Sequence, residues 1–346
     1  MRDSIFWSSI RAFFVTIFIL IGLGVGLVLV VLMLSGTSTT SITEFDKNYK
    51  QEVVANANGE RKSVSSSAPV ILKLNIHGVM GLENLTTAKI RRQLMESREG
   101  DLKDNRVKAV LLHINSPGGT VTDADGIYHA IKEYKEQYNV PVIAYIEGIC
   151  ASGGVYVACS ADKIYSSDIS MIGSVGVISP PFLNFYELMQ KFGVKALTIY
   201  EGKGKDDLNP TRPWEKDEGD NIRALIQFYY AKFVDIVSSN RPKLTKEILI
   251  NDLGAKVFNP IEAAEYGFTD GGMTYRDTLK LLLKQLKIED ETYEVVEMKK
   301  DNWVMQLFDA KSSLFTGELV HKVQLMPELD AKLMNQYLYI YLPNTN

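Results

Sequence analysis

Cysteine and histidine are scarce in this chain of 346 residues, with only two and four residues, respectively. Cys150 and Cys159 both lie in apolar stretches, which favours two buried free thiols over a disulfide. Because the sequence has no Cys-x-x-Cys pair and no Cys/His cluster, we expect no structural zinc site and no other metal or cofactor. The net charge of −4 lacks the basic excess typical of nucleic-acid-binding proteins, so a nucleic-acid partner is not expected either.

Charge is absent from one long run near the N-terminus. Residues 12–34, AFFVTIFILIGLGVGLVLVVLML, contain only one polar side chain, that of Thr16. The run is long enough to cross a bilayer as a helix and is longer than the apolar core of a cleavable signal peptide. Arg2 and Arg11 precede it, and no Lys or Arg follows until Lys47. We therefore expect residues 1–11 in the cytoplasm and a single-pass anchor in the inner (plasma) membrane, with the rest of the chain extracytoplasmic.

The rest of the sequence divides into three stretches of different composition. Residues 35–68 are rich in Ser, Thr, Asn and charged groups without clear periodicity, which is typical of a linker. In residues 69–289, β-branched apolar runs alternate with amphipathic segments, which predicts an α/β domain with a parallel sheet. Residues 290–346 form a C-terminal extension, in which the alternating segment QYLYIYLP is typical of an edge strand.

Within residues 69–289 the pattern predicts individual elements. Apolar runs indicate strands, and apolar residues at helical spacing indicate helices. The expected strands begin near residue 70 and include 107–114, 140–146 and DKIYSS at 162–167. The expected helices are 122–138, a segment starting after Ser152, 213–238, and 259–267 with its Asn cap, early Pro and closing Gly.

Two glycine-containing motifs stand at the ends of expected strands. INSPGG (114–119) leaves the amides of Gly118 and Gly119 uncovered, and CASGG puts Ser152 directly ahead of Gly153. Such amides can stabilise an oxyanion beside a nucleophilic hydroxyl at a strand-to-helix junction. The same residues are also typical of a turn that needs glycine and of a serine that caps a helix, so both interpretations stay open.

A nucleophilic serine needs a base, and the sequence offers two kinds. The four histidines, none of them in a distinctive loop, are His77, His113, His129 and His321. Lys203 and Lys205 lie in the glycine-punctuated segment IYEGKGKDDLNP (199–210). A lysine base must be buried so that its pKa falls from about 10.4 toward 7–8. A solvated charged loop would have the same spacing, so this interpretation stays open as well.

Taken together, four motifs resemble the signal peptide peptidase A family over about residues 70–275. They are INSPGG, GICASGGVYVACSADKIYSS, SMIGSVGVI and the Gly-x-x-Lys-Asp stretch in EGKGKD. Members of this family are membrane-anchored serine peptidases with a Ser-Lys dyad. The resemblance implies a crotonase/Clp-protease-like fold, a repeated ββα spiral core with parallel sheets behind one N-terminal transmembrane helix. It also implies a ring-like homo-oligomer and peptide substrates, such as remnant signal peptides or other membrane-associated peptides.

The resemblance also implies roles for five residues. Ser152 matches the nucleophile, Lys205 the general base, Gly119 and Gly153 the oxyanion donors, and Ser174 a serine that positions the lysine. The lysine loop departs from the family pattern, because it has Tyr-Glu-Gly where family members commonly have Lys-Ser-Gly, and Lys203 lies two residues from Lys205. The expected function is a membrane-anchored serine endopeptidase. The alternative is a catalytically inactive, membrane-tethered homologue that binds or scaffolds other proteins.

Overall fold

The computed structural model of the chain describes residues 5–36, 49–82, 85–289, 292–300 and 337–341. They belong to two units, which meet in the sequence between Asn48 and Tyr49. The first unit contributes helix α1 (Ile5–Gly36), whose large apolar side chains between Phe13 and Val25 are exposed. Among the residues whose side chains are described, no helix is long and apolar enough to cross a membrane.

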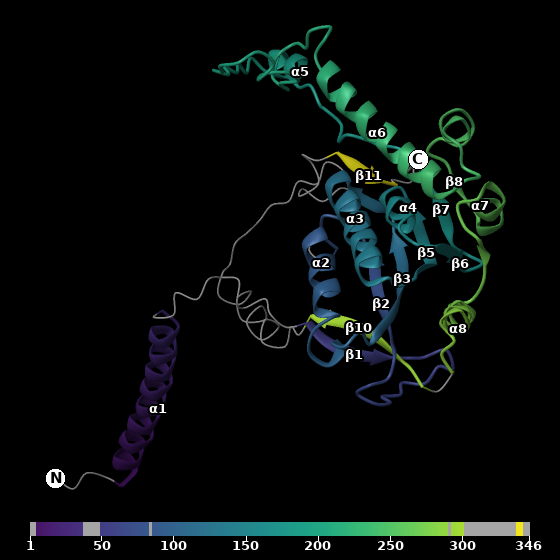
Figure 1. The fold of residues 1–346 in the computed structure, drawn as a ribbon. Coiled ribbons are helices and arrows are strands. Elements are labelled where there is room, and N and C mark those ends of the chain that lie inside the picture. The colour runs from purple at the N-terminus through teal and green to yellow at the C-terminus, as the bar shows by residue number, and fades with distance from the viewer. Residues whose placement is uncertain (1–4, 37–48, 83–84, 290–291, 301–336, 342–346) are drawn as a thin grey trace. The chain divides into compact units, whose positions relative to one another are not determined.

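The second unit is an α/β domain whose described strands belong mainly to one sheet (Figure 1). Its strands are β1 (Tyr49–Val54), β2 (Val70–His77), β3 (Val107–Ser116), β4 (Gly118–Thr120), β5 (Val142–Ala151), β6 (Lys163–Ser166), β7 (Met171–Gly173), β8 (Val257–Phe258), β9 (Gly271–Gly272), β10 (Glu294–Lys300) and β11 (Leu338–Ile340). Its helices are α2 (Thr87–Glu96), α3 (Val121–Tyr138), α4 (Gly153–Ala158), α5 (Tyr186–Lys191), α6 (Asp220–Asn240), α7 (Pro260–Tyr266) and α8 (Tyr275–Leu286), with a 3₁₀ turn η1 (Gly100–Leu102) and a π-helical turn η2 (Ile248–Leu253).

The described strands form a nine-stranded sheet in the order β1-β10-β2-β3-β5-β6-β9, with β7 pairing with both β5 and β8. The pairs within it are parallel except β1–β10 and β7–β8. A separate two-stranded antiparallel sheet joins β4 to β11. The expected α/β class with a parallel sheet is therefore confirmed.

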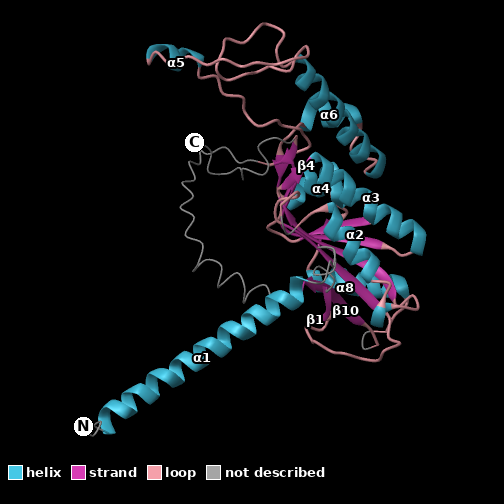
Figure 2. Ribbon diagram, turned by 90° about the vertical axis from the view of Figure 1, so that its left-hand side faces the viewer, coloured by secondary structure: helices cyan, strands magenta, loops and turns pink. Residues whose placement is uncertain are grey.

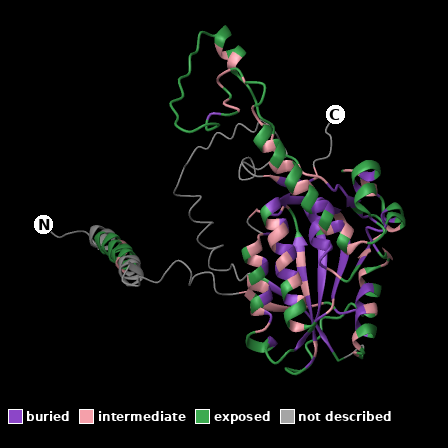
Figure 3. Ribbon diagram, turned by 45° about the horizontal axis from the view of Figure 1, so that its top comes forward, coloured by how far each residue is buried: buried purple, intermediate pink, exposed green. Residues whose placement is uncertain are grey.

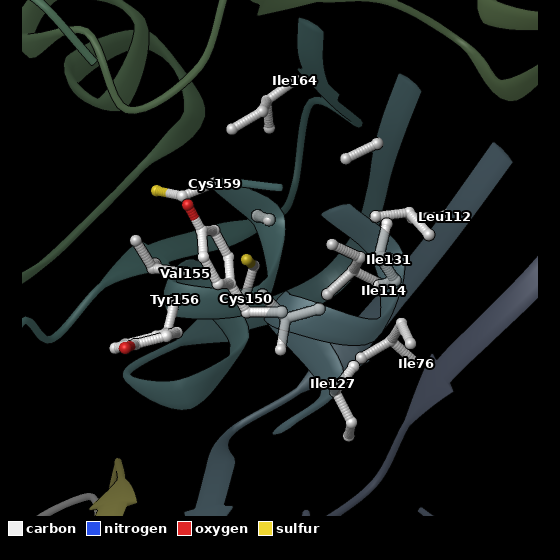
Figure 4. Close-up of a cluster of buried hydrophobic side chains, with 14 of the residues drawn as sticks. Ile76, Leu112, Ile114, Ile127, Ile131, Cys150, Val155, Tyr156, Cys159 and Ile164 are labelled. Atoms are coloured by element: carbon white, nitrogen blue, oxygen red, sulfur yellow. The ribbon is translucent and has the colours of Figure 1, made fainter. Parts of the chain in front are cut away.

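Both faces of the large sheet are covered, because successive side chains of a strand point to opposite sides. On one face, apolar side chains of β2, β3, β5 and β6 meet those of α3 and α4 (Figure 4). On the other face, Ile71, Leu111 and Ile143 pack with Leu279 and Leu282 of α8. The strands are buried between these two layers (Figure 3), as the near-continuous apolar runs of the sequence require.

Cys150 and Cys159 are both buried and free, which confirms the expectation from the sequence. They lie in the core between the sheet and α4 (Figure 4). Burial raises the pKa of the Cys159 thiol to about 12 and raises that of Cys150 as well. Both thiols are therefore protonated at neutral pH and act as small apolar side chains.

The expected elements of residues 69–289 are present, although the long helix differs in extent. The long helix predicted over 213–238 begins only at Asp220. The residues before it form turns. These turns end at Gly219, whose φ of +89° lies in the left-handed region and separates them from the helix. At 259–267 the predicted caps are present, since the Asn259 side chain accepts hydrogen bonds from the amides of Ile261 and Glu262.

Strands also occur in two stretches that had no predicted place in the sheet. Residues 49–54, inside the expected linker 35–68, form β1, and residues 294–300 of the expected extension form β10. Their pairing partners lie more than 200 residues apart, which local sequence pattern does not reveal. Residues 1–4, 37–48 and 301–336, the last including His321, lie outside the described residues, and the domain boundaries themselves stay a prediction.

A buried ion pair fixes β10 to the residue before β3. The Arg106 Nη2 atom lies 3.0 Å from Glu294 Oε2, and the guanidinium also donates to the carbonyls of Ser65, Ala68 and Asp101. Both side chains are less than a tenth exposed. Removing one partner would leave the other charge buried without compensation.

We predict that Arg106→Met lowers the free energy of unfolding by about 3 kcal/mol. Arg61→Met is the matched control, because Arg61 pairs with Glu52 but is 61% exposed, and it should cost less than about 1 kcal/mol. Urea denaturation of the two variants and the unsubstituted chain measures both values. Equal losses in the two variants would contradict the role assigned to the buried pair.

Candidate active site

Ser152 stands on a sharp turn between β5 and α4. Its amide donates to the carbonyl of Gly173 at 2.8 Å, which keeps it in line with the end of β7. Its φ of 53° and ψ of −115° lie in a region that residues other than glycine rarely adopt, and this backbone conformation costs roughly 1–3 kcal/mol. The surrounding packing therefore holds the serine in a strained turn of the kind used to present a nucleophile.

The Ser152 side chain does not cap the helix. It accepts no hydrogen bond from the first turn of α4, although the residue occupies the N-cap position. The side chain is 1% exposed, and its Oγ lies 3.5 Å from the carbonyl oxygen of Gly176, a long contact for a hydroxyl donor. The capping interpretation is therefore wrong, and the hydroxyl has no strong hydrogen bond within the described part of the chain.

The two glycine motifs meet beside this serine. A Cβ atom at Gly118 would lie 2.7 Å from the amide nitrogen of Gly153, so the two backbones are in contact. Gly118 has a φ of +100°, which glycine adopts without strain. Gly119, the residue expected to donate an oxyanion amide, follows directly and faces the backbone of Met80. The structure thus brings both motifs together, with Gly118 rather than Gly119 nearest to Gly153.

Ser116, which the sequence pattern alone did not mark as a site residue, holds the first of these loops. The Oγ atom of Ser116 donates to the carbonyl of Gly78 at 2.6 Å and accepts from the amide of Gly118 at 3.1 Å. Ser116 is fully buried, so these bonds are shielded from water. Its position ahead of Pro117 in INSPGG was the available signal, because serine side chains often bond to the backbone of the turn they start.

Ser174 lies next to the same turn. It follows β7, whose Gly173 pairs with Ala151 of β5, so the chain positions of Ser152 and Ser174 are adjacent across the two strands. The Ser174 amide donates to the carbonyl of Lys256 at 2.7 Å, and its φ is 59°. Its side chain is 6% exposed. The structure therefore places this predicted site residue beside Ser152, and its expected role with lysine stays a prediction.

Lys203 and Lys205 do not reach this turn in the described chain. Both side chains are exposed, in the segment between α5 and α6. That segment extends from the N-terminal end of α6, away from the sheet and from α4 (Figures 1 and 2). Among the described residues, no hydrogen bond or ion pair links either lysine to Ser152 or Ser174.

The segment that carries the lysines has its own internal support. Asp206 accepts hydrogen bonds from Arg212 Nε and Asn209 Nδ2, both at 2.6 Å, and Arg212 also pairs with Glu218. The hydrogen bond from Arg212 holds the pKa of the Asp206 carboxyl below its usual value. These contacts close the loop locally, while most of its surface is exposed (Figure 3).

Large apolar side chains are concentrated on the same protruding part of the chain, residues 178–200. Those that are at least 40% exposed are Ile178, Phe182, Leu183, Phe185, Leu188, Phe192, Val194, Leu197, Ile199 and Tyr200. A single-chain surface seldom exposes so many large apolar side chains in one stretch, so residues 178–200 have the character of a contact surface.

Strand β11 covers the open edge of β4. Tyr339 pairs with Gly119, and hydrogen bonds of Tyr341 to Pro117 at 2.7 Å and of Val121 to Tyr337 at 3.0 Å flank the pair. The Tyr339 carbonyl oxygen lies in the notch between Gly118 and Gly153, because a Cβ on either glycine would come within 3.1 Å of it. The predicted edge strand is thus confirmed, and its backbone occupies the candidate oxyanion site.

The ring of Tyr339 fills a pocket beside the same strand. It packs against Tyr156 and Phe233 with ring centroids 5.3 and 4.7 Å apart, and its hydroxyl donates to the carbonyl of Tyr229 at 2.8 Å. The pocket is therefore lined by aromatic side chains and offers one backbone acceptor at its end.

Two family models match the chain. Peptidase family S49 matches residues 134–289, which include Ser152, Ser174 and Lys205, and the N-terminal domain of NfeD1b matches residues 84–181. A provisionally named protease of Methanocaldococcus jannaschii is 34% identical over 195 residues, which make up 56% of this chain and 61% of that protein. The chain therefore spans less than two thirds of the length of this relative.

A longer match joins the chain to a provisionally named signal peptide peptidase SppA of Enterococcus faecium, 28% identical over 272 residues, or 76% of each chain. Among solved structures, a ClpP1 mutant from Listeria monocytogenes aligns with a TM-score of 0.39 and 18% identity, covering 60% of this chain and 94% of that one.

The close approach of Gly118 to β11 generates a prediction that needs no activity. In Gly118→Ala, the added Cβ would lie 1.8 Å from the Tyr339 carbonyl oxygen, so β11 must leave β4. We expect hydrogen exchange at the amides of residues 339–341 to rise at least about tenfold. Gly193→Ala is the control, since Gly193 also has a positive φ but no atom within 4 Å of the new Cβ. Unchanged exchange in Gly118→Ala would refute the close contact.

Proposed function

Since this chain belongs to the signal peptide peptidase A family of S49 peptidases, we propose that it is a membrane-anchored serine endopeptidase with a Ser152–Lys205 dyad. The family and the protease names of its relatives support a serine-type peptidase. The observation that carries the proposal is the strained, buried turn at Ser152, with the amide of Gly153 against the backbone of Gly118. The finer fold, a ββα spiral of the crotonase/Clp type, is part of the same proposal.

In the proposed reaction, a neutral lysine amine takes the proton of Ser152 Oγ while the oxygen attacks a peptide carbonyl carbon. The amides of Gly119 and Gly153 donate hydrogen bonds to the tetrahedral oxyanion. The ammonium then protonates the leaving amine, and the C–N bond breaks to give an acyl-enzyme. Water attacks the ester, the lysine accepts its proton, and the Ser152 hydroxyl is restored.

The position of β11 supports a mode of peptide binding. An extended peptide that adds a strand to β4 would use the same edge, and its carbonyl would lie where the carbonyl of Tyr339 lies. The aromatic pocket that holds the Tyr339 ring would then receive a side chain of the peptide. Such a peptide has to displace residues 338–340 before Ser152 can act on it.

A neighbouring subunit can supply the lysine that one chain lacks beside Ser152. The loop with Lys203 and Lys205 projects from the domain, and the apolar side chains of residues 178–200 that precede it are exposed. Burial of that surface against a second copy would remove the lysine amine from water, as a neutral base requires. The proposal therefore includes a homo-oligomer in which each site combines Ser152 of one subunit with Lys205 of another.

The membrane anchor and the substrates complete the proposal. The uncharged run 12–34 lies within α1, whose exposed apolar side chains suit contact with lipid. With Arg2 and Arg11 on the cytoplasmic side, the peptidase domain would face the outer side of the inner (plasma) membrane. The name of the Enterococcus faecium relative supports remnant signal peptides as substrates.

The dyad is tested by hydrolysis of an internally quenched, unstructured peptide by the detergent-solubilised chain. Ser152→Ala and Lys205→Ala should each lower kcat at least about a thousandfold, because nucleophile and base act as a unit. Lys203→Ala is the matched control and should keep most of the activity. Loss of activity only in Lys203→Ala would identify Lys203 as the base. Equal activity in all variants would mean that a contaminating peptidase cleaves the peptide, and would favour the alternative of an inactive homologue.

The shared site has its own test. Ser152→Ala and Lys205→Ala chains that are unfolded apart, mixed and reassembled should regain about a quarter of the unsubstituted activity. In a head-to-tail ring of randomly mixed subunits, about one site in four joins an intact serine to an intact lysine. If the mixture stays as inactive as either variant alone, the dyad forms within one chain.

A further inference from the structure

Three ionisable side chains form a hydrogen-bonded chain across β2, β3 and β5. His77 Nε2 lies 2.9 Å from His113 Nδ1, and His113 Nε2 lies 2.8 Å from Glu147 Oε2. They lie on the side of the sheet that packs against α8, and the His113 ring stacks on Tyr145 and meets the edge of Tyr275. The peptidase reaction proposed above uses none of these three residues.

The chain of side chains ends at an irregular point in β5. Ile114 of β3 pairs with Ile146, but Ser116 pairs with Cys150, so β5 contains two more residues than β3 over this step. Glu147 is the first of these residues, and Gly148 follows with a φ of +105°. The bulge lies five residues before Ser152 and sets the direction in which β5 continues toward it.

Asn115 holds the other side of the bulge. Its Oδ1 atom accepts a hydrogen bond from the Ile149 amide at 3.1 Å, and a Cβ at Gly148 would lie 2.7 Å from the same atom. Asn115 belongs to the strand that carries His113, two residues earlier. β3 therefore contacts the bulge at two points. Asn115 binds the backbone amide of Ile149, and His113 binds the side chain of Glu147.

The opposite end of the network leads to the glycine loop. His77 is followed by Gly78, whose amide donates to the Asn115 carbonyl at 2.9 Å and whose carbonyl accepts from Ser116 Oγ at 2.6 Å. Ser116 in turn holds the amide of Gly118. The network thus connects the segment that supports the candidate oxyanion loop with the segment that presents Ser152.

We propose that His77, His113 and Glu147 are positioning residues that align Ser152 with the oxyanion loop, and that the two histidines make this alignment sensitive to acid. The inference rests on the proposed peptidase function for its kinetic consequence, whereas its structural consequence is independent of activity. A shift of about 1 Å between nucleophile and oxyanion amides is enough to cost about a hundredfold in rate.

The sensitivity to acid follows from the number of protons that the two imidazole rings carry. In the neutral pair, one N–H lies between the two imidazoles, and His113 Nε2–H donates to Glu147. When both rings are protonated, two N–H groups face each other and that hydrogen bond is lost. The charged and titratable groups that face the pair are Lys73 of β2, Glu147 and Tyr145 of β5, Glu297 of β10 and Tyr275 of α8.

Burial and the charge of Lys73 favour the neutral form of the pair and outweigh the nearby carboxylates. Burial is the main cause and the positive charge of Lys73 the second. Together they lower the pKa of His113 to about 4 and lower the pKa of His77 below its usual value. Since the unfolded chain takes up these protons near pH 6.5, the stabilisation is complete above that pH and is lost as the pH falls from 6.5 toward 4. The bulge should therefore loosen over this range.

Two variants of His113 in the full-length, detergent-solubilised chain distinguish the positioning effect of its hydrogen bonds from the effect of its protonation. His113→Phe keeps a ring against Tyr145 but breaks both hydrogen bonds, so exchange of the amides of residues 147–152 should rise about tenfold at pH 7. His113→Gln offers one donor and one acceptor, as the neutral imidazole does, and should restore protection without titrating. His129→Phe is the control, because the His129 side chain on α3 is 46% exposed and its Nε2 atom lies 3.6 Å from Asp125 Oδ1, beyond hydrogen-bond distance.

The same variants give a pH profile and a kinetic readout. Between pH 6.5 and 4 the thermal midpoint of the unsubstituted chain should fall by several degrees more than that of His113→Gln. The kcat of His113→Phe should fall about tenfold or more at nearly constant KM, with recovery in His113→Gln. Unchanged exchange at 147–152 in His113→Phe, or an equal pH slope in His113→Gln, would overturn the inference. Inactivity of the unsubstituted chain would instead refute the proposed function, while exchange would still decide the positioning role.

Discussion

The arrangement of the candidate site depends on one constraint, the change of neighbours along β5. From Ile143 to Ile146 the strand pairs with β6, and from Ile149 to Ala151 it pairs with β7. A strand can change partners in this way only if it bends, and the bulge between the two halves provides the bend. The second half then ends at Ser152, whose amide is held by β7 and whose backbone is forced into a strained conformation.

The serine and the glycine amides are built into the rigid core, whereas the lysine is not. Gly153 and Gly118 are in backbone contact under a buried polar framework that includes Ser116. Lys205 lies on an exposed segment that is stabilised only by its own contacts around Asp206. This division is the basis of the proposal that two chains share one site, because the two halves belong to parts of the fold with different burial.

Local sequence pattern was sufficient where the determining interactions are local. The caps of α7 at Asn259 and Gly267 were predicted because their partners lie within three or four residues. The start of α6 was misplaced because Gly219 ends a set of turns that Arg212 and Glu218 support. β1 was missed because its partner, β10, is about 240 residues away and its own alternation is weak.

The sequence by itself determined the alternation of strands and helices, the two buried thiols, and the motifs around Ser152, since these follow from residue types at short spacing. Only the tertiary structure decided that Gly118 is nearest to Gly153, that Tyr339 occupies their notch, and that the lysines stay outside. These facts depend on which strands pair over long separations and on whether the segment with Lys203 and Lys205 packs against other parts of the protein. Residue patterns do not encode such distances, because packing of the whole chain sets them.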